Sequence, residues 1–225
     1  MSKLDVKLTR RTALKVGALT AAAVAVGVPV GSLKKSTVVK AAGTESGEKK
    51  QLGFLYDQSK CIGCNACAAA CKKTNNWEEG IEWRKVYSKN TDNGKVFLSM
   101  SCNHCAEPAC ASVCPVKAYT KREKDGIVMH RSEICVGCAY CLYACPYHAP
   151  DFNKAASGAV TKCSFCVEIQ DQGGKPACVS ACPVDALNYG DVNELRNRSG
   201  AVAPEVNGLP PASITNPSLV IIPKE

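Results

Sequence analysis

Apolar and polar positions alternate over only a few short stretches of this 225-residue chain. Gly94–Met100 alternates in part and begins at Asn93-Gly94, a pair typical of a β-hairpin turn. Two further short strands are predicted, at Asp125–Met129 and at Ala186–Tyr189. Three other stretches are too short for strong helices and are predicted as single turns: Ala66–Lys73, Ala111–Val113 and Leu142–Ala144. The pattern therefore predicts a small, loop-rich α+β fold.

The short elements are separated by sixteen cysteines that fall into four groups of four, with none left over. In chain order the groups are Cys61, Cys64, Cys67 and Cys71 (one); Cys102, Cys105, Cys110 and Cys114 (two); Cys135, Cys138, Cys141 and Cys145 (three); and Cys163, Cys166, Cys178 and Cys182 (four). Groups one and three have the C-x2-C-x2-C-x3-C spacing of bacterial ferredoxins, and groups two, three and four are each closed by proline. At four thiolates per cubane, the sixteen ligands predict about four [4Fe–4S] clusters.

The spacing inside the groups favours iron–sulfur clusters over other uses of cysteine. Three closely spaced thiolates can bind one cluster, and the fourth binds the other cluster of a pair. A zinc ribbon needs only two cysteine pairs, and a disulfide framework suits small secreted chains. The 20 residues between Cys114 and Cys135 suit one hairpin, so groups two and three can form one ferredoxin unit and groups one and four the other. Pairing of one with two and of three with four stays open.

The N-terminal segment has the pattern of an export signal. An apolar run from Val16 to Val30 follows a basic stretch and is shorter than the roughly 20 residues that a spanning helix needs. Thr9–Lys15 resembles the twin-arginine signal, although Ala13 stands where phenylalanine is usual. We expect residues 1–42 to direct export to the periplasmic face of the cytoplasmic membrane, with cleavage near Ala41 or Ala42. An uncleaved amphipathic anchor is the alternative.

Charge and composition set this segment and the C-terminal tail apart from the rest. Residues 1–42 hold 8 of the 28 Lys and Arg but 1 of the 20 Asp and Glu, so the remaining chain carries 20 against 19, a net charge of +1. The overall charge of +8 therefore gives no indication of a nucleic-acid partner. Residues 43–191 form the predicted cluster domain. Val192–Glu225 is proline-rich, and we expect a poorly ordered terminus, with an arm along a partner as the alternative.

Together these motifs resemble the four-cluster iron–sulfur subunits of the dimethyl sulfoxide reductase family of molybdopterin enzymes. The likeness is carried by Cys102-Asn103-His104-Cys105 through Pro115, by Asp125–Val128, by Ile134 through Cys145-Pro146-Tyr147, by Lys162–Cys166, and by Gly174–Cys178 through Cys182-Pro183. It covers residues 52–191. The family implies two intertwined ferredoxin-like units, with group one paired with group four and group two with group three.

The resemblance also implies which cysteines share a cluster. We call the four sets quartets: quartet one is Cys61, Cys64, Cys67 and Cys182; quartet two is Cys71, Cys163, Cys166 and Cys178; quartet three is Cys102, Cys105, Cys110 and Cys145; and quartet four is Cys114, Cys135, Cys138 and Cys141. With four thiolates each, the clusters do not need His104, His130 or His148 as ligands. His104 and His148 are expected to pack or to form local hydrogen bonds, with a role in tuning the clusters' potentials as the alternative.

The family further implies a non-catalytic electron-transfer subunit, linking a membrane quinol-oxidising anchor subunit to a molybdopterin catalytic subunit. The apolar runs of the sequence are too short for a membrane span, so we expect another subunit to reach the membrane. No nucleophile–base pair or phosphate-binding loop is visible in the sequence. Three alternatives remain: the equivalent subunit of a periplasmic hydrogenase or formate dehydrogenase, a stand-alone exported polyferredoxin, and a structural zinc protein.

Overall fold

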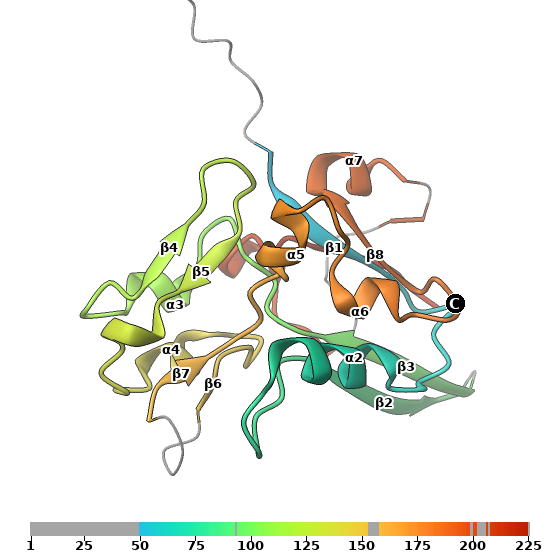
Figure 1. The fold of residues 1–225 in the computed structure, drawn as a ribbon. Helices are drawn as coiled ribbons and strands as arrows, with labels where there is room; N and C mark the ends of the chain where they lie inside the picture. The colour runs from blue at the N-terminus through green and yellow to red at the C-terminus, as the bar shows by residue number, and fades with distance from the viewer. Residues whose placement is uncertain are drawn as a thin grey trace, which may run out of the picture. The chain divides into compact units, whose positions relative to one another are not determined.

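The structure, a computed structural model, describes residues 50–92, 94–152, 158–198, 200–201, 206 and 208–224. The predicted signal segment lies outside the described residues. Figure 1 shows the elements in chain order, which are β1 (Leu52–Asp57), α2 (Ala66–Asn75), β2 (Lys85–Thr91), β3 (Gly94–Met100), α3 (Ala109–Ser112), β4 (Tyr119–Lys121), β5 (Val128–His130), α4 (Tyr140–Ala144), β6 (Asp151–Phe152), β7 (Val160–Thr161), α5 (Val167–Asp171), α6 (Ala177–Ser180), β8 (Leu187–Asp191), α7 (Val192–Arg196) and β9 (Leu219–Ile222). Two 3-10 turns, Ser132–Ile134 and Ala212–Ile214, complete the described elements.

The central sheet has three strands in the order β8-β1-β9. β8 runs antiparallel to β1 and β9 runs parallel to it. Every residue of β1 is buried, and because successive side chains of a strand point to opposite faces, β1 contributes to two cores. Phe54 and Tyr56 join the main core, while Leu55 packs with Leu195 and Val220 on the other face. The sheet thus anchors the loops that carry the cysteines.

The main core is built from aromatic rings and cysteines together. Phe165 is fully buried, with its ring centroid 4.3 Å from that of Phe54 and 5.1 Å from that of His104. Six cysteines belong to this core or pack against it: Cys61, Cys67, Cys105, Cys145, Cys178 and Cys182. The packing of the described residues therefore depends on what occupies the space between the sulfur atoms.

The helices that carry cysteines pack in two pairs, α2 with α6 and α3 with α4. α3 and α6 are single turns of four residues and α4 has five, as the sequence predicts. α2 is longer than predicted and continues for ten residues. The reason lies in the residue after the last cysteine of each group: Cys71 is followed by Lys72, whereas the other three are followed by proline, which disfavours helical backbone at the residue before it.

Three hairpins complete the described part of the chain, formed by β2–β3, β4–β5 and β6–β7. The predicted strand Gly94–Met100 is confirmed as β3, and it pairs with β2, which lies before the predicted hairpin turn but was not itself predicted as a strand. The predicted hairpin between Cys114 and Cys135 is confirmed as β4–β5, and the predicted strand Ala186–Tyr189 is β8, shifted toward the C-terminus. Among the described residues, no helix combines the length and the apolar character needed to cross a bilayer.

The expectation of a poorly ordered C-terminus is wrong for β9. Phe54 of β1 lies opposite Leu219, and the strand residues Leu219–Ile221 are buried. The brief apolar run gains its strand structure from a partner more than 160 residues away in sequence, which local pattern alone does not reveal. The last described residues therefore belong to the fold.

Candidate metal centres

Three of the four predicted quartets line pockets of their own. Quartet one surrounds a pocket of about 350 Å³, where the loop before α2 faces Cys182 from the end of α6. Quartet three surrounds one of about 360 Å³, and quartet four surrounds one of about 280 Å³. In each pocket three cysteines come from one group, and the fourth comes from the group whose helix packs against it.

Quartet two is gathered in the most enclosed part of the site. All four of its cysteines are buried. Burial raises the pKa of Cys71 above its ordinary value, and the neighbouring thiolates of Cys163, Cys178 and Cys166 raise it further. The Asn75 side-chain nitrogen lies 3.5 Å from Cys71 Sγ and 3.9 Å from Cys166 Sγ, so it reaches across the quartet. The structure therefore brings all four predicted sets together.

The grouping of four cysteines around each of three pockets fits a four-iron cluster. Among the described residues, no three His, Cys, Asp or Glu side chains converge closely enough to hold a single metal ion. The cysteines instead stand around pockets, as four thiolates do when each binds a different iron atom of a [4Fe–4S] cluster. The donor set and its arrangement therefore fit this cofactor.

Each cysteine loop is turned by a residue in the left-handed region, two positions after the first cysteine of the group. This residue is Gly63 (φ 71°), His104 (φ 44°), Gly137 (φ 65°) or Phe165 (φ 60°). Glycine adopts this conformation without strain, whereas other residues need support from the surrounding fold. His104 and Phe165 are both fully buried and contact each other, which supplies that support.

The last cysteine of each proline-closed group accepts a hydrogen bond from the chain four residues later. The backbone nitrogen of Ala118 donates to Cys114 Sγ at 3.2 Å, that of Ala149 to Cys145 Sγ at 3.5 Å, and that of Ala186 to Cys182 Sγ at 3.2 Å. Group one lacks the proline, and the side chain of Asn75 takes the same position toward Cys71 Sγ. These donors stabilise the thiolate form that binds iron.

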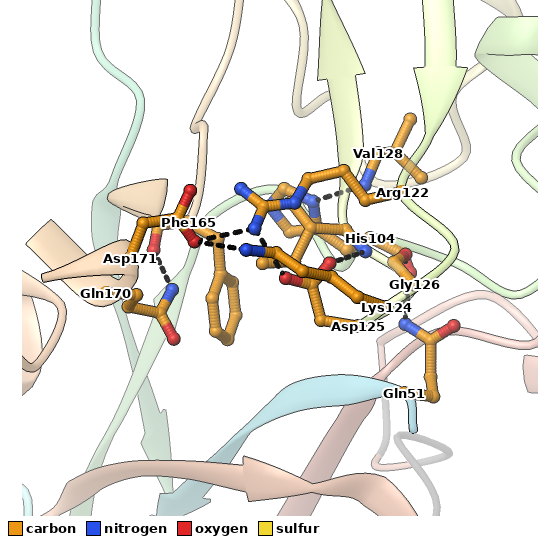
Figure 2. A network of polar contacts seen from close by, with 11 residues as sticks. Gln51, His104, Arg122, Lys124, Asp125, Gly126, Val128, Phe165, Gln170 and Asp171 are labelled. Carbon is orange, nitrogen blue, oxygen red and sulfur yellow. Dashed lines mark hydrogen bonds and ion pairs between the residues drawn. The ribbon is translucent and has the colours of Figure 1, made fainter. Parts of the chain in front are cut away.

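His104 is held in a polar network of backbone groups and the Gln51 side chain (Figure 2). Its Nδ1 accepts a hydrogen bond from the Val128 backbone nitrogen at 3.1 Å. Gln51 Nε2 lies 3.2 Å from the carbonyl oxygens of both His104 and Gly126. Burial, with the nearby Lys162 ammonium, holds the pKa of His104 well below its usual value. The predicted local hydrogen bonding of His104 is therefore confirmed.

The other two histidines occupy different surroundings. The His130 ring lies 4.7 Å from that of Tyr119, and burial, followed by the charge of Lys162, lowers the pKa of His130 to about 4. His148 is exposed and has a left-handed backbone with φ of 50°.

Comparison with known proteins places this arrangement in a family. Two models, each described as a 4Fe-4S dicluster domain, match residues 60–118 and 94–192. The B subunit of the anaerobic dimethyl sulfoxide reductase of Escherichia coli (strain K12) is 43% identical over 185 residues, covering 77% of this chain and 89% of the relative. The chain belongs to the dimethyl sulfoxide reductase family.

Two further relatives are named for different enzyme systems. The thiosulfate reductase electron transfer subunit PhsB of Salmonella typhi is 39% identical over 151 residues, which is 64% of this chain and 78% of the relative. The hydrogenase-2 operon protein HybA of Escherichia coli O157:H7 is 37% identical over 174 residues, or 64% of this chain and 53% of the relative. Within the dimethyl sulfoxide reductase family, this chain is an iron–sulfur electron-transfer subunit with four [4Fe–4S] clusters, and not the catalytic subunit.

Several residues beside the quartets of this iron–sulfur subunit were not predicted from the sequence. Asn75 serves quartet two, and Ser99 Oγ lies 3.5 Å from Cys67 Sγ of quartet one. Arg84 and Lys162 are basic side chains that the fold buries. Asn75 and Arg84 fall in a stretch that resembles a polar insertion, so only the packing reveals their roles. Lys162 stands directly before Cys163 in a stretch that carries the family likeness, and this position is a sequence signal that could have identified it.

Proposed function

We propose that this chain conducts electrons between a membrane quinol-oxidising subunit and a molybdopterin-containing catalytic subunit of an anaerobic respiratory reductase. The relatives named as the B subunit of dimethyl sulfoxide reductase and as a thiosulfate reductase electron transfer subunit support this assignment. When bound, the clusters supply one-electron chemistry. The chain provides their ligands and surroundings, and the substrate chemistry belongs to the partner.

Each quartet is proposed to hold one [4Fe–4S] cluster, within two intertwined ferredoxin-like units. Groups one and four form the first unit and groups two and three the second. The packing of α2 on α6 and of α3 on α4 supports this nested pairing. The pockets lined by quartets one, three and four support the individual ligand sets.

The observation that carries the proposal is an unbroken series of quartets. Quartets one and two share α2, in which Cys71 lies one turn after Cys67. They also share α6, which carries Cys178 and ends shortly before Cys182. Quartets two and three meet where the buried side chains of Cys163 and Cys102 pack in one cluster. Quartets three and four share the α3–α4 pair. The order one–two–three–four gives a continuous path for electrons.

Both ends of this path reach the surface. Cys64 of quartet one and Cys138 of quartet four are exposed, whereas quartet two is buried. Large apolar side chains stand exposed beside quartet four, among them Val136 (63% exposed) and Tyr140 (60%), and Ile62 (59%) stands beside quartet one. Exposed apolar groups of this kind mark protein-interaction sites, which supports partner contacts at both ends.

Residues 1–42 are proposed to be a twin-arginine signal that delivers the folded, cluster-loaded chain to the periplasmic face of the cytoplasmic membrane. Residues 43–191 then form the cluster domain, and residues 192–225 a proline-rich C-terminal segment. Assembly before export keeps sixteen thiols in a reducing compartment until the clusters are bound.

The native complex tests this function. The full chain, tagged at its C-terminus, is purified without oxygen from the membranes of anaerobically grown cells of its source. We expect molybdenum or tungsten in the preparation, a catalytic subunit and a membrane subunit in its mass spectrum, and reduction of the clusters by a quinol. The paired variant Arg10→Lys and Arg11→Lys keeps the charge but removes the signal, and it is expected to retain its clusters and remain in the cytoplasm.

Two outcomes would contradict the proposal. Nickel in place of molybdenum or tungsten would assign the chain to a hydrogenase, the second candidate, which the likeness to HybA favours. An iron–sulfur protein that purifies alone, without any stoichiometric partner, would be a stand-alone carrier.

A further inference from the structure

Arg84 is a buried cation with a fixed position. Its residue is 2% exposed. The guanidinium donates hydrogen bonds to Ser99 Oγ at 3.0 Å and to Ser101 Oγ at 2.8 Å, and it lies 4.7 Å from the centroid of the Phe54 ring. None of the ion pairs among the described residues includes Arg84. A buried charge is costly unless an opposite charge is near, so the partners of this guanidinium need an explanation.

The groups that face Arg84 are cysteines of two quartets. Burial by itself lowers the pKa of Arg84, but the thiolates of Cys178, Cys163, Cys67 and Cys71 raise it, and the net pKa lies above its usual value. Cys67 belongs to quartet one, and the other three belong to quartet two. Ser99 links the guanidinium to quartet one, because its Oγ lies 3.0 Å from Arg84 Nη1 and 3.5 Å from Cys67 Sγ. Arg84 therefore stands at the junction of quartets one and two.

Lys162 occupies the corresponding position at the next junction. The residue is 4% exposed, and its ammonium donates hydrogen bonds to the carbonyl oxygens of Val128 and Cys163. Cys163 belongs to quartet two, whereas Lys162 lines the pocket of quartet three and its charge counteracts the rise in the pKa of Cys110 there. No ion pair among the described residues includes Lys162.

Quartet four has different neighbours. Its pocket is lined by Tyr119 and His130. Among the described residues that line this pocket there is no lysine or arginine. The two buried cations therefore face quartets one, two and three, and quartet two faces both of them.

We propose that Arg84 and Lys162 set the reduction potentials of the clusters that they face. Addition of one electron makes a cluster more negative, and a fixed cation in a medium of low dielectric constant stabilises the reduced form more than the oxidised form. Arg84 raises the potentials of the clusters in quartets one and two, and Lys162 raises those in quartets two and three. This inference rests on the proposed ligand sets.

Potentials measured on the intact, cluster-loaded chain test this role. Redox titration followed by electron paramagnetic resonance compares the wild type with Arg84→Gln and Lys162→Gln, in which an amide replaces the charge. We expect Arg84→Gln to lower the potentials of two clusters and Lys162→Gln to lower those of two clusters, with only one cluster affected by both. At a fixed poise, the ratio of reduced to oxidised cluster should fall about tenfold, which is 59 mV for one electron.

Two control variants separate charge from structure. Arg84→Lys keeps the charge and should restore the potentials toward the wild-type values. Arg122→Gln removes a cation that pairs with Asp125 and Asp171, and it should leave all four potentials unchanged. If Arg84→Gln does not retain its iron, the potentials of Lys162→Gln and Arg84→Lys, compared with those of the wild type, still test the proposal.

Unchanged potentials in a Lys162→Gln or Arg84→Gln protein that keeps about sixteen irons per chain would overturn the proposal, as would an equal shift of all four clusters. The titration does not need the partner subunits. Absence of a molybdopterin partner would therefore contradict the proposed function while leaving this result interpretable.

Discussion

Removal of the iron–sulfur clusters is expected to unfold most of the chain. The main core packs directly against cysteines, and α3, α4 and α6 have only four or five residues, too few to persist without tertiary contacts. In small metal proteins of this kind, binding free energy is folding free energy. The far-ultraviolet circular dichroism and the visible iron–sulfur absorption should disappear together when an iron chelator is added without oxygen.

The loss of iron and of the folded structure should be faster at lower pH. Without metal, burial raises the pKa of Cys105 to about 11, and burial followed by neighbouring thiolates raises those of Cys110 and Cys163 to about 12. At neutral pH these free thiols bind protons, so iron must displace protons to bind and protons compete with it. A chain that keeps its circular dichroism after all iron is removed would contradict the account.

The cysteines of α2 should prove to serve different clusters although they lie one helical turn apart. Cys71→Ser is expected to abolish the same electron paramagnetic resonance signal as Cys178→Ser, because both residues belong to quartet two. Cys67→Ser should abolish a different signal, that of quartet one. Each substitution should lower the iron content from about sixteen toward about twelve per chain. The signals are compared on protein reduced to a common potential.

The alternative pairing gives a different result from the same variants. If group one paired with group two, Cys71 would share a cluster with cysteines of group two, and Cys71→Ser would match Cys102→Ser. A match between these two spectra, with Cys178→Ser unlike either, would reject the nested arrangement.

The sequence was most informative for features that depend on residues close together in the chain. The cysteine spacing predicted the four groups, and the residue types after Asn93-Gly94 predicted the strand β3. The strand predicted over Asp125–Met129 is only partly right, because β5 begins at Val128. Gly63 and Gly137 adopt the left-handed backbone of the cysteine loops without strain, as their residue type allows. His104 and Phe165 hold the same backbone although their residue types do not favour it, because their support comes from each other. The nested pairing depended on a family resemblance, since spacing alone allowed two solutions.

Long-range packing accounts for what the sequence did not reveal. β9 becomes a strand only by pairing with β1, and its proline-rich surroundings indicate the opposite. Arg84 and Lys162 are of residue types that usually lie on the surface, and only the fold places them among the quartets. The length of α2 was the exception, because the absence of a proline after Cys71 was visible in the sequence.

The iron and acid-labile sulfide content of the native chain tests the central claim most directly. Purified without oxygen and loaded in its own host, the chain should contain about sixteen irons and sixteen sulfides, all in [4Fe–4S] clusters by Mössbauer spectroscopy. A colourless protein that holds zinc without iron, or one with iron for only two clusters, would contradict the account.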